Sequence, residues 1–243
     1  MKQNILILII LLLIIGCKNN VIICSTKDMA STFSIGDQLR LQKIDTLHRN
    51  DVISYKLPNM DKPGILRVVG LPGDEILIDS GIVYVNGNKF TFPHSSREVF
   101  VVYCEDPYNF QKLKKYNFSN YSLNYSFFSL NKKEFKEIQS SGIPDSIYKI
   151  IHKRAQIDKK LIFNSGFKFR NRHFFGPLVV PKLGNEITEN ILNLTPNTLN
   201  RNDLGKIITE DFFFCLGDNL PEADDSRVIG LIAKSSLIGK VVD

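Results

Sequence analysis

The fold of this chain is decided by the stretch Leu66-Arg67-Val68-Val69-Gly70-Leu71-Pro72-Gly73-Asp74. Its first half is almost continuously apolar, which is typical of a strand buried on both faces. A second block, Gly217-Asp218-Asn219 running on to Asp224-Asp225-Ser226-Arg227, follows another apolar run at residues 210–216. Two apolar segments that are far apart in the chain and that both end in turn residues predict central strands of a β-rich core.

The segments around these blocks also have the pattern of short strands. Residues 38–43 alternate between polar and apolar side chains, and residues 51–55 follow a polar turn. The ranges 75–79 and 82–85 predict a β-hairpin, with Asn86-Gly87 as the turn after it. Strand character returns at Phe175–Pro181, where flanking prolines favour a sheet edge, and at residues 210–216. The predicted fold class is therefore mostly β.

The composition changes between residues 103 and 172, where lysine, asparagine, serine and aromatic residues dominate. Residues 131–139 predict a helix that begins at a capping asparagine. Basic aromatic stretches can bind nucleic acid by stacking, but a solvated insertion fits an exported chain better. We therefore predict a β-core formed by residues 17–102 and 173–243, interrupted by a basic, aromatic α/β insertion at 103–172.

The N-terminus predicts export. A cationic start precedes an apolar run from Ile5 to Ile15, which is too short to span the hydrocarbon core and is typical of a signal peptide. The run ends Ile15-Gly16-Cys17 and resembles a bacterial lipobox, in which the cysteine is lipidated. An uncleaved anchor helix is the alternative. In either case we expect residues 1–16 to be a signal peptide or membrane anchor and the rest of the chain to be held at the membrane outside the cytoplasm. With a lipid on Cys17, the protein would be a periplasmic or outer-membrane lipoprotein.

Composition and side-chain spacing exclude several classes of function. Hydrophobic content of 43% and charged content of 23% are those of a globular protein, and the net charge of +6 is mild. No helix-turn-helix or RNA-binding motif accompanies that charge, so we expect no nucleic-acid partner. None of the four cysteines forms a CxxC pair and the four histidines are scattered, so no metal site is expected. Cys104 and Cys215 lie among apolar residues and are predicted to be buried.

The two blocks resemble the longest signature blocks of the type I signal peptidases, which are membrane-anchored serine proteases that remove export signals. Phe175-Gly176-Pro177 with Pro181 resembles the Bacteroidetes branch of that family. The resemblance implies a mostly β fold, a serine nucleophile, a lysine general base and no cofactor. A lysine acts as a base only where burial lowers its pKa.

The family's nucleophile block aligns without a gap on Asp28-Met29-Ala30-Ser31-Thr32-Phe33-Ser34-Ile35-Gly36-Asp37. In this register the nucleophile position is Asp28. The resemblance places at Thr26 a hydroxyl that helps to hold the oxyanion. A further family block appears as Arg49-Asn50-Asp51. An aspartate at the nucleophile position opposes an oxyanion electrostatically.

The two other catalytic positions are also changed. The base position is Leu66, and the serine that would orient the base is Ala223. Framework residues are kept; these are Met29, Gly36, Asp37, Arg67, Gly70, Pro72, Gly73, Asp74, Gly217, Asp218, Asn219, Asp225, Ser226 and Arg227. We expect Asp225 to pair with Arg67 or with Arg227. Because losing one member of such a catalytic unit costs roughly 10⁴- to 10⁶-fold in rate, the joint loss predicts a protein without peptidase activity.

Three functions remain open from the sequence. The first is a non-catalytic member of the family that binds extended exported peptides, or another signal peptidase, along a strand edge. The second is an active signal peptidase with a displaced dyad of Ser25 or Ser31 with Lys62. The third is a structural lipoprotein with a vestigial groove. A serine hydroxyl close to a buried lysine amine would favour the second.

Overall fold

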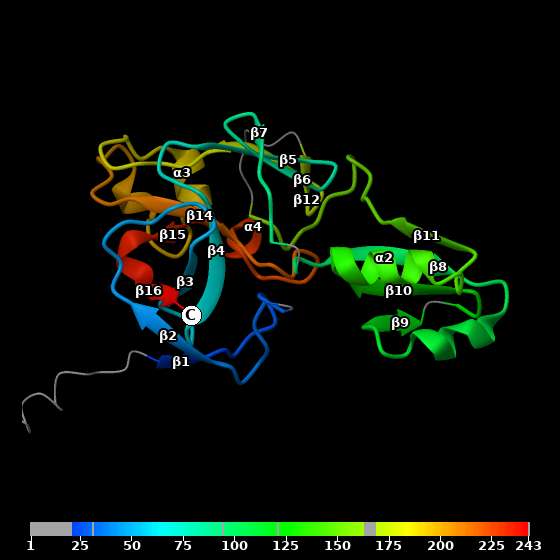
Figure 1. Cartoon of the computed structure of the whole chain (residues 1–243). Helices are drawn as coiled ribbons and strands as arrows, with labels where there is room; N and C mark the ends of the chain where they lie inside the picture. The colour runs from blue at the N-terminus through cyan, green and yellow to red at the C-terminus, as the bar shows by residue number, and fades with distance from the viewer. Residues whose placement is uncertain (1–20, 31, 94, 121, 163–168, 243) are drawn as a thin grey trace, which may run out of the picture.

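The computed structural model describes residues 21–30, 32–93, 95–120, 122–162 and 169–242, and its strands form three sheets (Figure 1). The predicted mostly β class is confirmed. The predicted signal peptide or anchor at residues 1–16 and the lipidation site Cys17 lie outside the described residues. Among those described, no helix is long and apolar enough to cross a membrane.

The largest sheet contains the apolar strand that begins the block at residues 66–74 and the apolar strand that leads into the block at residues 217–227. Its strands, in spatial order, are β1 (Val21–Ile23), β2 (Gln38–Gln42), β16 (Leu237–Val242), β3 (Val52–Tyr55), β4 (Gly64–Gly70), β14 (Phe212–Leu216) and β15 (Ile232–Ala233). Every residue of β4 and β14 is buried, as their apolar runs predict. The two strands pair directly, Leu216 opposite Arg67, so the turns that follow them come from neighbouring strands.

The second sheet has the order β12 (Phe169–Asn171), β13 (Phe174–Val179), β5 (Glu75–Asp79), β6 (Ile82–Val85) and β7 (Asn88–Lys89). Asn86 and Gly87 both have positive φ, and Val85 pairs with Asn88 across them, so they form the tight turn that the sequence predicts. β12 covers only the first half of β13, and Leu178 and Val179 pair with β5 alone among the described strands. That half of β13 is at a sheet edge.

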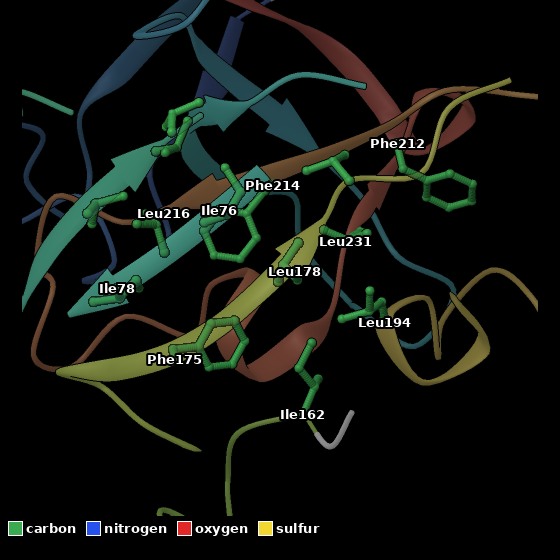
Figure 2. Close-up of a cluster of buried hydrophobic side chains, with 14 of the residues drawn as sticks. Ile76, Ile78, Ile162, Phe175, Leu178, Leu194, Phe212, Phe214, Leu216 and Leu231 are labelled. Carbon is green, nitrogen blue, oxygen red and sulfur yellow. The ribbon is translucent and has the colours of Figure 1, made fainter. Parts of the chain in front are cut away.

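The main core fills the space between these two sheets (Figure 2). The alternation of β5 sends Ile76 and Ile78 inward, where they join Phe175 and Leu178 of β13 against Phe214 of β14. The rings of Phe175 and Phe214 are 6.1 Å apart. Helix α3 (Glu189–Leu194) closes the cluster with its buried leucines. Burial of each large apolar side chain contributes about 1.5–3 kcal/mol, which holds the two sheets together.

The insertion forms the third sheet and a core of its own, and it extends to one side of the molecule (Figure 1). Its elements are β8 (Glu98–Tyr103), η1 (Pro107–Leu113), β9 (Phe118–Asn120), β10 (Tyr125–Leu130), α2 (Lys132–Ser140) and β11 (Ser146–Lys149). The predicted helix is α2, which starts at a capping box formed by Asn131 and Glu134.

The limits of the insertion differ from the predicted 103–172. Its sheet begins with β8 at Glu98 and ends with β11 at Lys149, whereas β12 pairs with β13 and so belongs to the core. The physical reason is that alternation in a strand shows which side chains are buried and does not show against which sheet they pack.

Three of the remaining connections contain short helices: η2 (Arg201–Asp203), α4 (Ser226–Ile229) and η3 (Lys234–Ser236). The three described cysteines are Cys24, Cys104 and Cys215; all are buried and unbridged. Their burial confirms the prediction that Cys104 and Cys215 are core residues.

Candidate functional site

The predicted nucleophile segment contacts the turn after β14. Residues from the early and the late part of the chain therefore meet at this point. The backbone N–H of Asn219 donates to the carbonyl of Asp28 at 2.9 Å, and the Asn219 side chain donates to Lys27 O at 3.1 Å. Met29 is fully buried and its sulfur accepts from the N–H of Asp218 at 3.5 Å, across 189 residues of chain. The alignment at Met29, Gly217, Asp218 and Asn219 thus corresponds to real contacts.

A buried ion pair connects β4 to the same turn. Arg67 donates to both carboxylate oxygens of Asp218, from Nε at 2.8 Å and from Nη2 at 2.6 Å, and both side chains are almost fully buried. Its Nη1 also donates to Asn50 O, and the Thr32 hydroxyl donates to Asp218. Four signature blocks therefore meet at one charged centre. Breaking such a pair is strongly unfavourable, because it leaves one charge buried without its partner.

A second buried pair shapes the end of the last block. Arg227 donates to both oxygens of Asp225, at 2.9 and 2.6 Å, and to Leu220 O at 2.8 Å. Asp225 also caps α4 and accepts from Gly217 N at 3.3 Å. Ser226 accepts from Cys215 N. Of the two partners expected for Asp225, the structure selects Arg227, and Arg67 pairs with Asp218 instead.

The remaining framework residues stabilise turns. The Asp74 carboxylate accepts hydrogen bonds from the Arg49 guanidinium at 2.7 Å, from the Leu71 N–H and from the Asn86 amide. These bonds fix the turn after β4. Within that turn Gly73 has φ +90° and takes the left-handed conformation that glycine allows. Asp37 accepts from Ser34 N in the first block, and Gly36 has φ +99°. These residues hold the scaffold of the site and do not reach its centre.

Asp28, at the nucleophile position, is half-buried and accepts the N–H of Asp224 at 3.0 Å. Burial raises the pKa of its carboxyl group, the hydrogen bonds from Thr26 and Asp224 oppose the rise, and the charges of Asp224 and Asp225 add to it. Thr26, expected to serve an oxyanion, instead acts on this carboxyl group and lowers its pKa. A carboxylate among carboxylates repels a developing oxyanion.

Ala223 lies close to Asp28. The methyl group is fully buried, and a Cβ added to Gly217 would come within 2.4 Å of both the Ala223 Cβ and the Asp28 carbonyl oxygen. The close packing explains the glycine at position 217. No hydroxyl is available at Ala223 to orient a base.

Leu66 is fully buried in an apolar cluster with Tyr55 and Cys215. The ring of Tyr55 crosses Gly64, where an added Cβ would lie 2.6 Å from it. Burial raises the pKa of Tyr55, and the negative charge of Asp28 is the next cause. Apolar and aromatic atoms therefore occupy the surroundings of the base position. Sequence reasoning missed Tyr55, because nothing in the strand pattern of residues 51–55 distinguishes it from an ordinary core tyrosine.

No described lysine is buried. All are exposed except Lys149 and Lys240, which are half-buried and form ion pairs with Glu98 and Asp51. Lys62 is exposed, and the Ser25 hydroxyl donates to the carbonyl of Pro63 at 3.3 Å. Ser31 lies outside the described residues. A neutral lysine base requires desolvation, which the positions of these side chains do not provide.

The accessible surface beside Asp28 is a hollow of about 520 Å³. It lies between the first block and the insertion, and its lining includes Thr26, Lys27, Phe33, Ile35 and Arg97. β1 leads into it as the edge strand of the largest sheet, with exposed Val21 and Ile23 side chains. Within the described residues, no group of three or more His, Cys, Asp or Glu is arranged to hold a metal ion.

Comparison with known proteins places this fold and site in a family. The model of the family "Signal peptidase, peptidase S26" matches residues 1–242, so the chain belongs to the signal peptidase family. It is similar to signal peptidase I V of Bacillus subtilis (strain 168), with 38% identity over 69 residues, which are 27% of this chain and 40% of that protein.

The solved structures include a signal peptidase I of Enterococcus faecalis V583 with 16% identity and a TM-score of 0.35. The match covers 82% of this chain and all of the other chain. The match to the Bacillus subtilis protein spans 40% of the length of that curated relative.

Proposed function

We propose that this chain is a non-catalytic member of the signal peptidase family that binds extended exported polypeptides beside Asp28. Membership of the family rests on the match to its model along nearly the whole chain. The loss of catalysis and the binding of peptides are inferred from the site. The N-terminal segment would hold the protein at the membrane, through a lipid on Cys17 or through an uncleaved anchor.

The observation that carries the proposal is the environment of the base position. Leu66 is sealed in an apolar cluster, and every described lysine is exposed or half-buried in an ion pair. Serine activation in this family's mechanism needs a neutral amine near the hydroxyl. The position of Ser25, bound to Pro63 O beside Lys62, is the one observation that favours the displaced dyad, and the exposure of Lys62 opposes it.

The edge of β1 supports peptide binding. Cys24 donates to Asp37 O and accepts from Gly36 N, so its backbone groups point toward β2. In an antiparallel strand the backbone groups of successive residues point to opposite sides, so those of Ile23 point to the outer edge, where no described strand pairs with β1. An extended peptide paired with this edge would run toward the hollow that begins at Thr26.

A proline substitution tests this mode of binding. Ile23→Pro removes the outward N–H, whereas Ile23→Ala keeps it, and the side chain is 61% exposed, so both variants should stay folded. We expect a fluorescein-labelled signal-sequence peptide to bind the wild type and Ile23→Ala alike by fluorescence anisotropy. Ile23→Pro should weaken binding roughly tenfold, the value of one lost hydrogen bond.

Other outcomes would point to other functions. If the peptide does not bind to the wild type, the chain is a structural lipoprotein with a vestigial groove. If Ile23→Pro binds as well as Ile23→Ala, the peptide lies elsewhere. Lipidation is tested separately, because radiolabelled palmitate should attach to the wild type and not to Cys17→Ala.

A further inference from the structure

A small cavity of about 150 Å³ lies away from Asp28, where the core meets the insertion. Its walls come from the β5–β6 hairpin, from Val99 of β8, from Ile150 after β11, and from Leu220 in the turn after β14. It adjoins a more open hollow of about 580 Å³, and the two share Gly81, Val83, Glu98 and Leu220. None of the positions that the family alignment assigns to catalysis lines either space.

The walls of the cavity are mainly apolar, with Ile78 and Val83 on the hairpin facing Val99, Ile150 and Pro221. A cavity of about this volume is sufficient to bind benzene in a protein interior. The adjoining hollow continues the apolar lining through Phe90, Phe92, Phe100 and Phe135. The space is therefore suited to a ligand with an aromatic or short alkyl body.

The charged lining is predominantly basic. Arg172 is mostly buried; it donates to Ala223 O at 2.8 Å, and its nearest acidic partner is Asp158 at 3.9 Å. Arg227 is neutralised by Asp225. The adjoining hollow adds Lys89, Lys132 and Lys149. Glu98, which pairs with Lys149, is the one acidic residue among the described residues of either lining. Arg172 is thus a mostly buried cation whose ion pair with Asp158 is long, and no described carboxylate lies within hydrogen-bond distance of it.

Two histidines add a polar corner. The rings of His152 and His173 meet edge to face at 4.7 Å, and both line the cavity. His173 Nδ1 accepts from the backbone N–H of His152, so the proton of the neutral ring is on Nε2. His152 Nδ1 is buried and has no hydrogen-bond partner among the described residues. A buried polar atom without a partner costs about 1–3 kcal/mol, which a ligand that supplies a partner recovers.

We propose that this cavity binds a small carboxylic acid with an aromatic or alkyl body, the acid group lying between Arg172 and the two histidines. A carboxylate in the cavity would add the charge-assisted hydrogen bond that Asp158, at 3.9 Å, does not make with Arg172. Its apolar body fills the space between the β5–β6 hairpin and Leu220. The site is independent of peptide binding at β1, since no residue of β1 or of the first block lines it.

Calorimetric titration of the full chain in an uncharged detergent tests the site, with phenylbutyrate as the probe. We expect phenylbutyrate to bind, and the neutral phenylbutyramide and the cationic phenylbutylamine to bind roughly 10- to 100-fold more weakly, because they lose a charge-assisted hydrogen bond. Arg172→Gln should weaken phenylbutyrate binding by a similar factor. Arg201→Gln, which changes an arginine on the exposed surface, should leave it unchanged.

A cavity-filling variant provides a second test, in case Arg172→Gln does not fold. Val99→Phe adds volume from a half-buried position without altering a polar contact, and it should abolish phenylbutyrate binding while the melting temperature stays near that of the wild type. The proposal is overturned if phenylbutyrate fails to bind the wild type. It is also overturned if the three probes bind equally, or if Val99→Phe binds phenylbutyrate like the wild type.

Discussion

The three positions that the family resemblance assigns to catalysis carry side chains of a different chemistry from serine and lysine. Asp28 is a hydrogen-bonded carboxylate at the nucleophile position, Leu66 is a core side chain at the base position, and Ala223 packs against Gly217. Tyr55 completes the change, because its ring lies across Gly64 in the cluster that contains Leu66. Asp28 and Ala223 thus lie close together, and each of the three replacements is packed or hydrogen-bonded.

The raised pKa of Asp28 predicts how stability depends on pH. A carboxyl group whose pKa is higher in the folded than in the unfolded chain favours folding below the unfolded value of about 3.9. That contribution is lost as the pH rises through the folded value. Asp28→Asn, whose side-chain oxygen can still accept from Asp224 N, should therefore stabilise the chain at pH 7 and lose this advantage near pH 3.9.

Urea unfolding of wild type and Asp28→Asn at both pH values measures this effect. Asp61→Asn, in the exposed turn after β3, is the matched control and should change little at either pH. A destabilised Asp28→Asn at pH 7 would contradict the account, since it would mean that the ionised carboxylate stabilises the fold.

The ion pair of Arg67 with Asp218 predicts a large loss on removing one partner. Arg67→Met should cost about 3–5 kcal/mol of unfolding free energy, because it leaves a buried carboxylate uncompensated. The double variant Arg67→Met with Asp218→Asn should cost less than the sum of the single changes. Denaturant unfolding measures both, and Arg201→Gln in an exposed pair should cost less than about 1 kcal/mol. Strict additivity would show that the two side chains do not act as a pair.

At the scale of elements, β4 and β14 carry the site. Their pairing places the turn after β14 beside the ion-pair centre, and α4 follows within the same block. The chain enters the insertion at β8 and leaves it after β11. At this junction the backbone N–H of Ile150 donates to the carbonyl of Val99 at 2.9 Å. All members of its buried cluster lie within residues 100–138.

Removal of the insertion is therefore a test of the domain boundaries. Replacing residues 100–149 by a short Gly-Ser linker should leave a core that unfolds cooperatively, because no buried member of the other three clusters is lost. The urea m-value should fall, since it scales with the surface exposed on unfolding. Circular dichroism during urea unfolding measures both. Loss of cooperative unfolding would show that the core needs the insertion.

Much of the whole molecule could be predicted because its signals are local. The buried runs of β4 and β14, the Asn86-Gly87 turn and the capping box of α2 each depend on residues that are close in sequence.

Other features depend on packing between distant segments and were not predictable. Arg67 pairs with Asp218, which is 151 residues away in the chain. The sequence alone does not show whether Asp218 or Asp225 is the closer of the two carboxylates to Arg67. The sheet to which β8 belongs follows from tertiary pairing with β10 and β11. The cavity at His152 and Arg172 exists only where the insertion meets the core.

The central claim, that this member of the signal peptidase family is not a peptidase, is tested most directly by cleavage of a signal-peptide substrate by the purified full chain. We predict no cleavage by the wild type, and measurable cleavage at most in the variant with Asp28→Ser, Leu66→Lys and Ala223→Ser combined. Cleavage by the wild type that disappears in Lys62→Ala would contradict the account and establish a displaced dyad.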